Sequence, residues 1–174
     1  MKMVPMILAL SIWGGAAGPA RAQTAVSNGA VPAANDALPS GDLWRVMVSP
    51  YSYHFSRSAE HRSVYMIGLE RQRADGYLLG ASWFRNSFGQ PSAYVYGGRR
   101  FDHFSRYEPL FAQLTAGLLY GYKEPYEDKV PFNHNGFSPG LVVSLGWQFT
   151  PAYSAQVNIL GNSALMFQFS VDFR

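Results

Sequence analysis

Residues 110–122 read LFAQLTAGLLYGY, and apolar residues occupy every second position of this stretch. Successive side chains of a strand point to opposite faces, so this period predicts a strand with one apolar face. The same period recurs in GLVVSLGWQF (140–149), YSAQVNI (153–159) and LMFQFSVDF (165–173). The faces opposite the apolar ones carry mainly Gly, Ser, Gln and Asn. An apolar face towards lipid and a small, polar face towards a lumen are typical of a transmembrane β-barrel.

Four earlier segments alternate less regularly, at residues 43–54, 63–72, 76–86 and 93–101. Together the segments make eight strands, an even number that suits a small closed barrel. RADG (73–76) and TPAY (150–153) read as tight turns, whereas residues 55–62, 87–92 and 122–136 read as longer outer loops. A soluble eight-stranded barrel of lipocalin type also alternates, but it directs its apolar face inward and its charged face outward.

The sequence therefore predicts an all-β fold, an eight-stranded antiparallel transmembrane β-barrel of the bacterial outer membrane, over residues 43–174. Residues 1–22 have a basic start, an apolar stretch and an Ala-Arg-Ala end, the pattern of a signal peptide. Residues 23–42 lack a hydrophobic period and are expected to form a flexible N-terminal segment. The chain of 174 residues is long enough for one domain, and it contains no cysteine, which excludes disulfides and lipoprotein anchoring.

Composition narrows the possible partners. Lys2 and Arg21 lie in the predicted signal peptide, which leaves 12 of the 14 basic residues against 11 acidic ones. A nearly neutral mature chain gives no support for nucleic-acid binding, and no phosphate-binding loop or metal-spaced histidine cluster is found. Glu70 and Asp172 are the main charges expected in the lumen. The expected partners are the membrane bilayer and its lipids, with a monomeric barrel and no cofactor or metal.

Three residues able to carry chemistry are expected at one rim of the barrel. His54 closes the first strand, and Asn86 and Ser87 close the third. Odd-numbered strands end on the same side, so all three residues belong to the external rim. A histidine can act as a base and a serine as a nucleophile, although a polar pair before Phe-Gly-Gln-Pro is also ordinary turn chemistry.

The order of these residues resembles that of the outer-membrane lipid A palmitoyltransferase family (PagP). The similar stretches are SPYSYHF, GLERQRADGYLLGASWFRNSFGQPSAYVYGGRRF, LTAGLLYGY and VPFNHNGFSPGLVVSLGWQF. The resemblance implies that a palmitoyl chain moves from a phospholipid to lipid A, with His54 as the base and Ser87 as the catalytic hydroxyl. Asn86 stands where the family has an aspartate, so it could orient His54 only by hydrogen bonding, or another acid such as Glu60 could serve.

Further residues fit this reading. Arg57, Arg62 and Arg85 are candidates for binding lipid A phosphates. Glycines expected to face the lumen would either leave room for an acyl chain or simply permit close packing. The resemblance also suggests that prolines in or beside strands mark lateral gates for a lipid tail: Pro50, Pro91, Pro131 and Pro139.

Two alternatives remain open from the sequence. His134 and Ser138 lie four residues apart in the third outer loop, an arrangement similar to that of the outer-membrane lipid A deacylases. The chain could instead be a structural or adhesive barrel without enzymatic activity. A lumen filled by charged residues would favour the structural barrel, whereas a histidine and a serine above an apolar lumen would favour the transferase.

Overall fold

The computed structural model describes residues 41–56 and 62–174. The predicted signal peptide (1–22), nearly all of the segment 23–42, Arg57 and Glu60 lie outside the described residues. Within the described part, no helix is long and apolar enough to cross a membrane.

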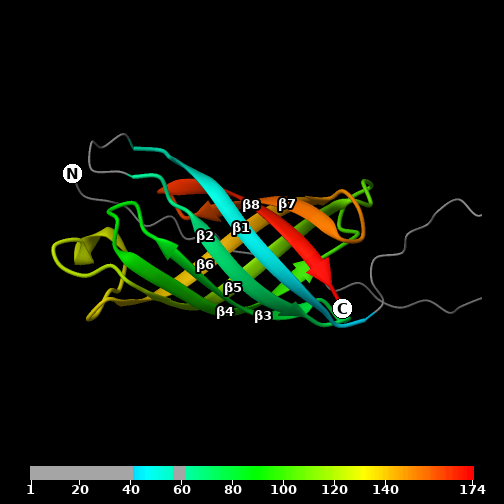
Figure 1. Ribbon diagram of the computed structural model, residues 1–174, viewed down its shortest axis with the longest axis horizontal. Helices are drawn as coiled ribbons and strands as arrows, with labels where there is room; N and C mark the ends of the chain where they lie inside the picture. Colours follow the sequence, from blue (N-terminus) through cyan, green and yellow to red (C-terminus); the bar gives the residue numbers. More distant parts are fainter. Residues whose placement is uncertain (1–40, 57–61) are drawn as a thin grey trace, which may run out of the picture. The chain divides into compact units, whose positions relative to one another are not determined.

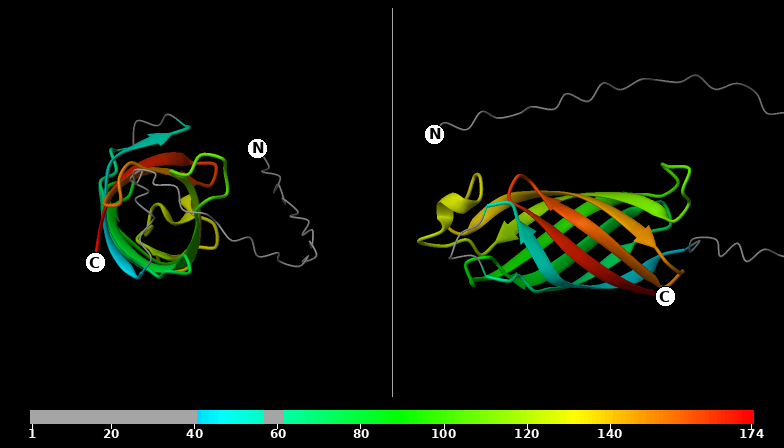
Figure 2. Two further views of the ribbon diagram at one scale, coloured as in Figure 1. Left: turned by 90° about the vertical axis from the view of Figure 1, so that its right-hand side faces the viewer. Right: turned by 90° about the horizontal axis from the view of Figure 1, so that it is seen from above.

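The described chain is a closed antiparallel barrel in which each strand pairs with its neighbours in sequence and the last pairs with the first. Figure 2 shows the ring of strands end-on in its left view. The predicted all-β, eight-stranded barrel is confirmed, and most of the predicted segments match to within three residues. The strands are β1 (Leu43–His54), β2 (Met66–Gln72), β3 (Tyr77–Arg85), β4 (Pro91–Phe101), β5 (Leu110–Tyr120), β6 (Phe137–Gln148), β7 (Tyr153–Leu160) and β8 (Ala164–Phe173).

The two ends of the barrel differ in their connections. One end, here called the turn end, carries the connections 73–76, 102–109 and 149–152 (Figure 1). The first residue of β1 and the last residue of β8 lie at this end too. The other, the loop end, carries 55–65, 86–90, 121–136 and 161–163, with the short 3-10 helix η1 (Glu127–Lys129). The tight turn expected at 73–76 is present: Gly76 has a φ of +84° and donates its N–H to the Arg73 carbonyl. Glycine is favoured there because a Cβ crowds the backbone at positive φ.

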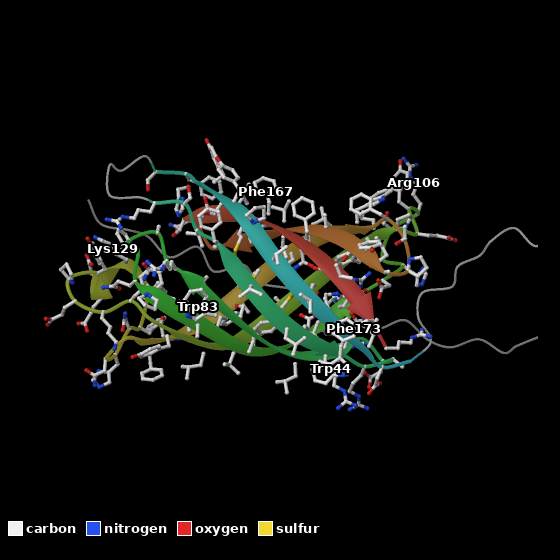
Figure 3. The ribbon with its side chains drawn as sticks, in the orientation of Figure 1. Trp44, Trp83, Arg106, Lys129, Phe167 and Phe173 are labelled. Carbon is white, nitrogen blue, oxygen red and sulfur yellow. The ribbon has the colours of Figure 1, made fainter. Side chains whose placement is uncertain are left out.

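The outward face of the barrel is apolar, as expected for a face in contact with lipid. Large aromatic side chains stand near both ends, and aliphatic ones such as Leu69, Val95 and Leu141 lie between them. Figure 3 shows Trp44 and Phe173 towards the turn end and Trp83 further along the barrel. Two aromatic girdles around an aliphatic band are typical of membrane barrels. The girdle at the turn end comprises Trp44, Tyr77, Phe101, Trp147, Phe149, Tyr153 and Phe173, and that at the loop end Tyr51, Tyr53, Trp83, Phe137 and Phe167.

Buried charges fill the turn-end half of the lumen. Arg45 on β1 is 1% exposed, and its guanidinium donates to both carboxylate oxygens of Asp172 at 2.6 and 2.8 Å. It also donates to Glu70 at 2.9 Å, and Glu70 accepts further hydrogen bonds from Tyr96 at 3.1 Å and Gln113 at 3.0 Å. The lumen positions of Glu70 and Asp172 are thus confirmed. Buried charges persist only where each is paired and hydrogen-bonded, a condition that this bidentate arrangement meets.

Arg100 on β4 adds a second cation to the same half of the lumen. It pairs with Asp102 at 2.8 Å, donates to Gln148 at 2.9 Å, and lies 3.5 Å above the centre of the Phe111 ring. The arginines were not expected in the lumen from the sequence, although Arg45 shares the inward alternation of Leu43 and Met47. These side chains occupy the turn-end half of the lumen.

We expect Arg45→Met to lower the free energy of unfolding by about 3–5 kcal/mol, because it leaves two carboxylates buried without their cation. Denaturant unfolding in detergent micelles would measure the change. Arg71→Met is the matched control, since Arg71 pairs with Asp42 on the exposed surface and such pairs contribute less than about 1 kcal/mol. Equal losses in the two variants would contradict the assigned role of Arg45.

Candidate functional site

A cavity of about 860 Å³ occupies the loop-end half of the lumen. Its lining runs from the middle of the strands to all four loop-end connections. The walls are largely apolar because β1 to β4 direct Met47, Met66, Phe84 and Tyr94 inward, and Leu119, Val142 and Met166 come from the facing strands. A narrow eight-stranded barrel is therefore hollow at one end and packed at the other.

The floor of the cavity is polar and meets the buried charges. Tyr96 lies at the boundary, where its ring stacks on Tyr94 with 4.8 Å between centroids and its hydroxyl donates to Glu70. Glycines make room for these rings: a Cβ at Gly80 would lie 2.5 Å from the Tyr96 ring, and one at Gly140 2.6 Å from the Tyr94 ring. The lumen glycines could either leave room for an acyl chain or permit close packing. Gly80 and Gly140 permit close packing, because an aromatic ring fills the space beside each of them.

A β-bulge turns His54 towards this cavity. The residues of β1 alternate regularly up to Ser49, but Pro50 and Tyr51 both face outward, and the register against β8 shifts between Val48 and Tyr51. A bulge changes which residues of a strand face inward. After the bulge, the even-numbered residues Ser52 and His54 face the lumen. Without the shift in register, the odd-numbered residues of β1 would continue to face inward. The bulge also explains why the alternation of residues 43–54 is irregular in the sequence.

Asn86 and Ser87 follow β3 in a tight turn beside the cavity. The Asn86 side chain is 1% exposed and organises the turn: its Oδ1 accepts the N–H groups of Phe88 at 3.1 Å and Gln90 at 2.9 Å. Its Nδ2 donates to the Gly121 carbonyl at 3.4 Å, which ties the turn to the β5–β6 connection. This Asx-type turn presents Ser87, which is 7% exposed, to the cavity.

Tyr122 joins Ser87 in lining the cavity. The sequence places Tyr122 on the lipid-facing side of the strand at 110–122, and this expectation was wrong. The strand ends at Tyr120, and Gly121 has a φ of +133°. A Cβ at Gly121 would collide with Ser92 and the Pro91 carbonyl, so only glycine allows this change of direction. The Gly-Tyr pair after a regular alternation was the only signal in the sequence.

Of the arginines proposed for substrate binding, Arg62 and Arg85 do not line the cavity, and Arg57 lies outside the described residues. Arg62 is exposed and donates its backbone N–H to the Ser87 carbonyl at 2.8 Å, and its side chain lies over Gly89. Arg85 is exposed on the outward face at the loop end of β3. Lys129, for which the sequence pattern predicts no role, lines the cavity at the β5–β6 connection.

In the loop-end half, adjacent strands separate at two places around the barrel. The β1–β2 ladder ends at the pair Ser49–Met66, and the β6–β7 ladder ends at Val143–Ile159. The last five residues of β1 therefore have no ladder partner on β2, and the first six residues of β6 have none on β7. Pro50 and Pro139 lie within these stretches. Pro91, by contrast, begins β4 opposite Arg85, and Pro131 lies in the β5–β6 connection.

His134 and Ser138 have different surroundings. Ser138 is 1% exposed, lines the cavity, and donates its hydroxyl to the Pro131 carbonyl at 2.5 Å. His134 is exposed in a turn in which it exchanges two backbone hydrogen bonds with Phe137, and it does not belong to the lining of this cavity. His54 and Ser87, in contrast, line the same cavity. The described residues contain no group of His, Cys, Asp or Glu able to hold a metal ion.

Comparison with known proteins supports the fold alone. No family model and no curated protein matches the chain. A designed transmembrane β-barrel is similar, with a TM-score of 0.51 and 16% identity over 78% of this chain and 97% of that chain. The N-terminal barrel domain of Pseudomonas aeruginosa OprF has a TM-score of 0.39 and 13% identity over 77% of this chain and 96% of that domain. The closed ring of strands and the likeness to the designed barrel give the chain the fold of an eight-stranded transmembrane β-barrel.

We expect Asn86→Ala to cost about 1–3 kcal/mol of stability, because two backbone N–H groups lose their buried acceptor. Denaturant unfolding would measure this loss. Asn162→Ala serves as the control: Asn162 is exposed in the β7–β8 connection, where a substitution should change stability by less than about 0.5 kcal/mol. If the two variants were equally stable, the Asn86 side chain would not organise the turn.

Proposed function

We propose that this protein is an outer-membrane lipid A acyltransferase that moves a palmitoyl chain from a phospholipid to lipid A. The observation that carries the proposal is the apolar cavity that His54 and Ser87 both line. In the proposed setting the signal peptide directs export, the loop end faces the cell exterior, and the turn end faces the periplasm. Lipid A then lies beside the loop end, where the proposed reactive groups are.

The cavity suits a long acyl chain. Its volume of about 860 Å³ falls within the range of small-molecule sites, and its walls are mostly apolar. The buried charges around Arg45 occupy the lumen below, so a chain that enters from the loop end stops at the polar floor.

The unpaired strand edges supply routes for the chain from the bilayer. A lipid tail that enters laterally has to pass between two strands, which is possible only where the ladder of hydrogen bonds is interrupted. The interruptions between β1 and β2 and between β6 and β7 both lie beside the cavity. Proline has no N–H to donate, so Pro50 and Pro139 help to keep these edges unpaired.

The proposed reaction is transfer of an acyl group between two oxygen atoms. His54 withdraws the proton from Ser87 or from the acceptor hydroxyl of lipid A, and the resulting nucleophile attacks the ester carbonyl of the phospholipid. The ester bond to the leaving glycerol oxygen breaks, and that oxygen takes up a proton. If Ser87 is acylated, the lipid A hydroxyl then removes the acyl group from it. In this proposal Asn86 holds the turn that carries Ser87, since its polar atoms bond to that turn and to Gly121.

Cationic groups at the loop end favour an anionic acceptor. Arg62 lies directly against the turn that carries Ser87, and Arg85 is exposed at the end of the same strand. Together with Arg57 and with Lys129 at the cavity, they would bind the phosphates of lipid A. This arrangement would place the acceptor hydroxyl above the cavity.

Expression in a Gram-negative host without its own lipid A palmitoyltransferase tests the proposal. We expect the mass of lipid A to rise by one palmitoyl group, and His54→Ala and Ser87→Ala each to abolish the gain. His134→Ala and Ser63→Ala are matched controls, since both residues are exposed and outside the cavity lining, and they should leave the gain unchanged. Mass spectrometry of extracted lipid A, with barrel folding checked by heat-modifiable electrophoretic mobility, gives the readout.

Other outcomes would select the alternatives. Loss of one acyl chain from lipid A would favour a deacylase and direct attention to Ser138 and His134. An unchanged lipid A mass with a correctly folded barrel would count against both lipid A enzymes and favour a structural barrel.

A bulky residue in the cavity provides an independent prediction. Val142 lines the cavity, whereas its neighbour Val143 faces lipid and is 47% exposed. We expect Val142→Trp to reduce palmitoyl transfer at least tenfold, because the indole occupies space needed by the chain, and Val143→Trp to retain it. Initial rates of transfer would be compared; equal rates in the two variants would show that the chain does not occupy the cavity.

A further inference from the structure

We propose that Phe132 is a substrate-binding residue whose ring contacts the acyl chain of the phospholipid at the mouth of the cavity. The inference rests on the proposed acyl transfer, which supplies that chain. It names a side chain to which neither the strand pattern nor the resemblance to the palmitoyltransferases gives a role. Phe132 belongs to the β5–β6 connection at the loop end, where Figure 3 also shows Lys129.

The Phe132 side chain is largely uncovered and yet belongs to the cavity lining. At 85% exposure it is the most exposed of the large hydrophobic side chains in the described residues. The residues of the aromatic girdles lie on the outward face of the barrel, whereas Phe132 lies beyond the strands and lines the cavity. An exposed ring that also lines the cavity stands at the mouth of that cavity.

The backbone at Phe132 adopts a conformation that bulky residues avoid. Its φ is +58°, in the left-handed region, where the Cβ atom crowds the following carbonyl oxygen. Glycine and asparagine enter this region more readily than phenylalanine does. A bulky residue in this conformation is strained, and such strain persists only where the surrounding structure fixes the backbone.

Hydrogen bonds on both sides of Phe132 fix its backbone. The Pro131 carbonyl accepts a hydrogen bond from the hydroxyl of Ser138 at 2.5 Å, and Ser138 itself is 1% exposed. On the other side, Asn133 Nδ2 donates to the Tyr122 carbonyl at 2.6 Å. The residues before and after Phe132 are therefore both anchored, and the turn presents the ring at a fixed place.

An acyl chain is the partner that suits this ring. Only a small part of the ring is covered by the protein, so most of its apolar surface is available for contact. Val130 and Pro131, in the same connection, add further apolar side chains to the cavity lining. A chain that passes the ring would cover apolar surface on both partners, which is favourable in proportion to the area removed from water.

The test is the variant Phe132→Asn, which removes the ring and introduces a residue that tolerates a positive φ. Phe55→Asn is the matched control, because Phe55 is an exposed ring at the same end of the barrel and does not belong to the cavity lining. Purified protein would be studied in micelles of fixed composition. The measurements are the Kd of a fluorescent polyene fatty acid, and kcat and KM for transfer from a palmitoyl phospholipid to lipid A.

We expect Phe132→Asn to raise Kd and KM about 5- to 20-fold and to leave kcat unchanged, since partial burial of a phenyl ring supplies affinity of this size without acting on the reacting atoms. Phe132→Leu keeps an apolar side chain and should stay within about threefold of wild type. The denaturation midpoint of Phe132→Asn should stay at or above the wild-type value, because the substitution relieves backbone strain.

Three results would overturn the inference. Wild-type values of Kd and KM in Phe132→Asn would leave the ring as a contact with the bilayer only. A lower denaturation midpoint in Phe132→Asn would show that the ring supports the fold. An equal rise of Kd in Phe55→Asn would show that loss of any exposed ring at this rim has the same effect.

The Kd measurement separates this inference from the proposed function, because fatty-acid binding requires no transfer. If the wild-type protein transfers palmitate but Phe132→Asn keeps its Kd and KM, the role of Phe132 fails and the transferase stands. If the wild-type protein binds the fatty acid without transferring palmitate, and Phe132→Asn weakens that binding, the proposed function fails and Phe132 remains a contact for an apolar chain. A wild-type protein that binds no fatty acid would overturn the role of Phe132.

Discussion

The ion pairs of Arg45 with Asp172 and Glu70 divide the lumen into two halves, and the rest of the interior is arranged around this division. Charges removed from water have to be paired, and the barrel meets this requirement by drawing carboxylates from β2 and β8 and a guanidinium from β1 onto one level. Polar side chains from other strands complete the hydrogen bonds. Below this level the lumen is filled, and above it the interior need not be polar.

The upper half of the lumen is a cavity with largely apolar walls, in an otherwise narrow barrel. Shortened ladders next to it leave two strand edges unpaired, at the level where the cavity lies. In the proposed function, an apolar chain would have its site in this cavity and its route from the bilayer at these edges.

Several side chains of the cavity lining are placed by departures from regular strand geometry. The bulge at Pro50 and Tyr51 directs His54 inward, and the Asx-type turn of Asn86 presents Ser87. The left-handed backbone at Gly121 brings Tyr122 off the lipid-facing side. In each case a local irregularity moves one side chain to a new position, while the regular ladders on either side keep the backbone rigid.

The sequence by itself determined the barrel: the strands and their outward faces follow from an alternation with period two, because lipid selects for apolar side chains on one face. The pattern was clear for β5 to β8, whose inward residues are mostly small or polar, and blurred for β1 to β4, whose inward residues include charged side chains and much of the apolar cavity wall. Only the tertiary structure decided that His54 and Ser87 share a cavity with Tyr122 and that His134 does not. Bulges, turns and ion pairs across the lumen join residues far apart in the chain, and no local period encodes such contacts.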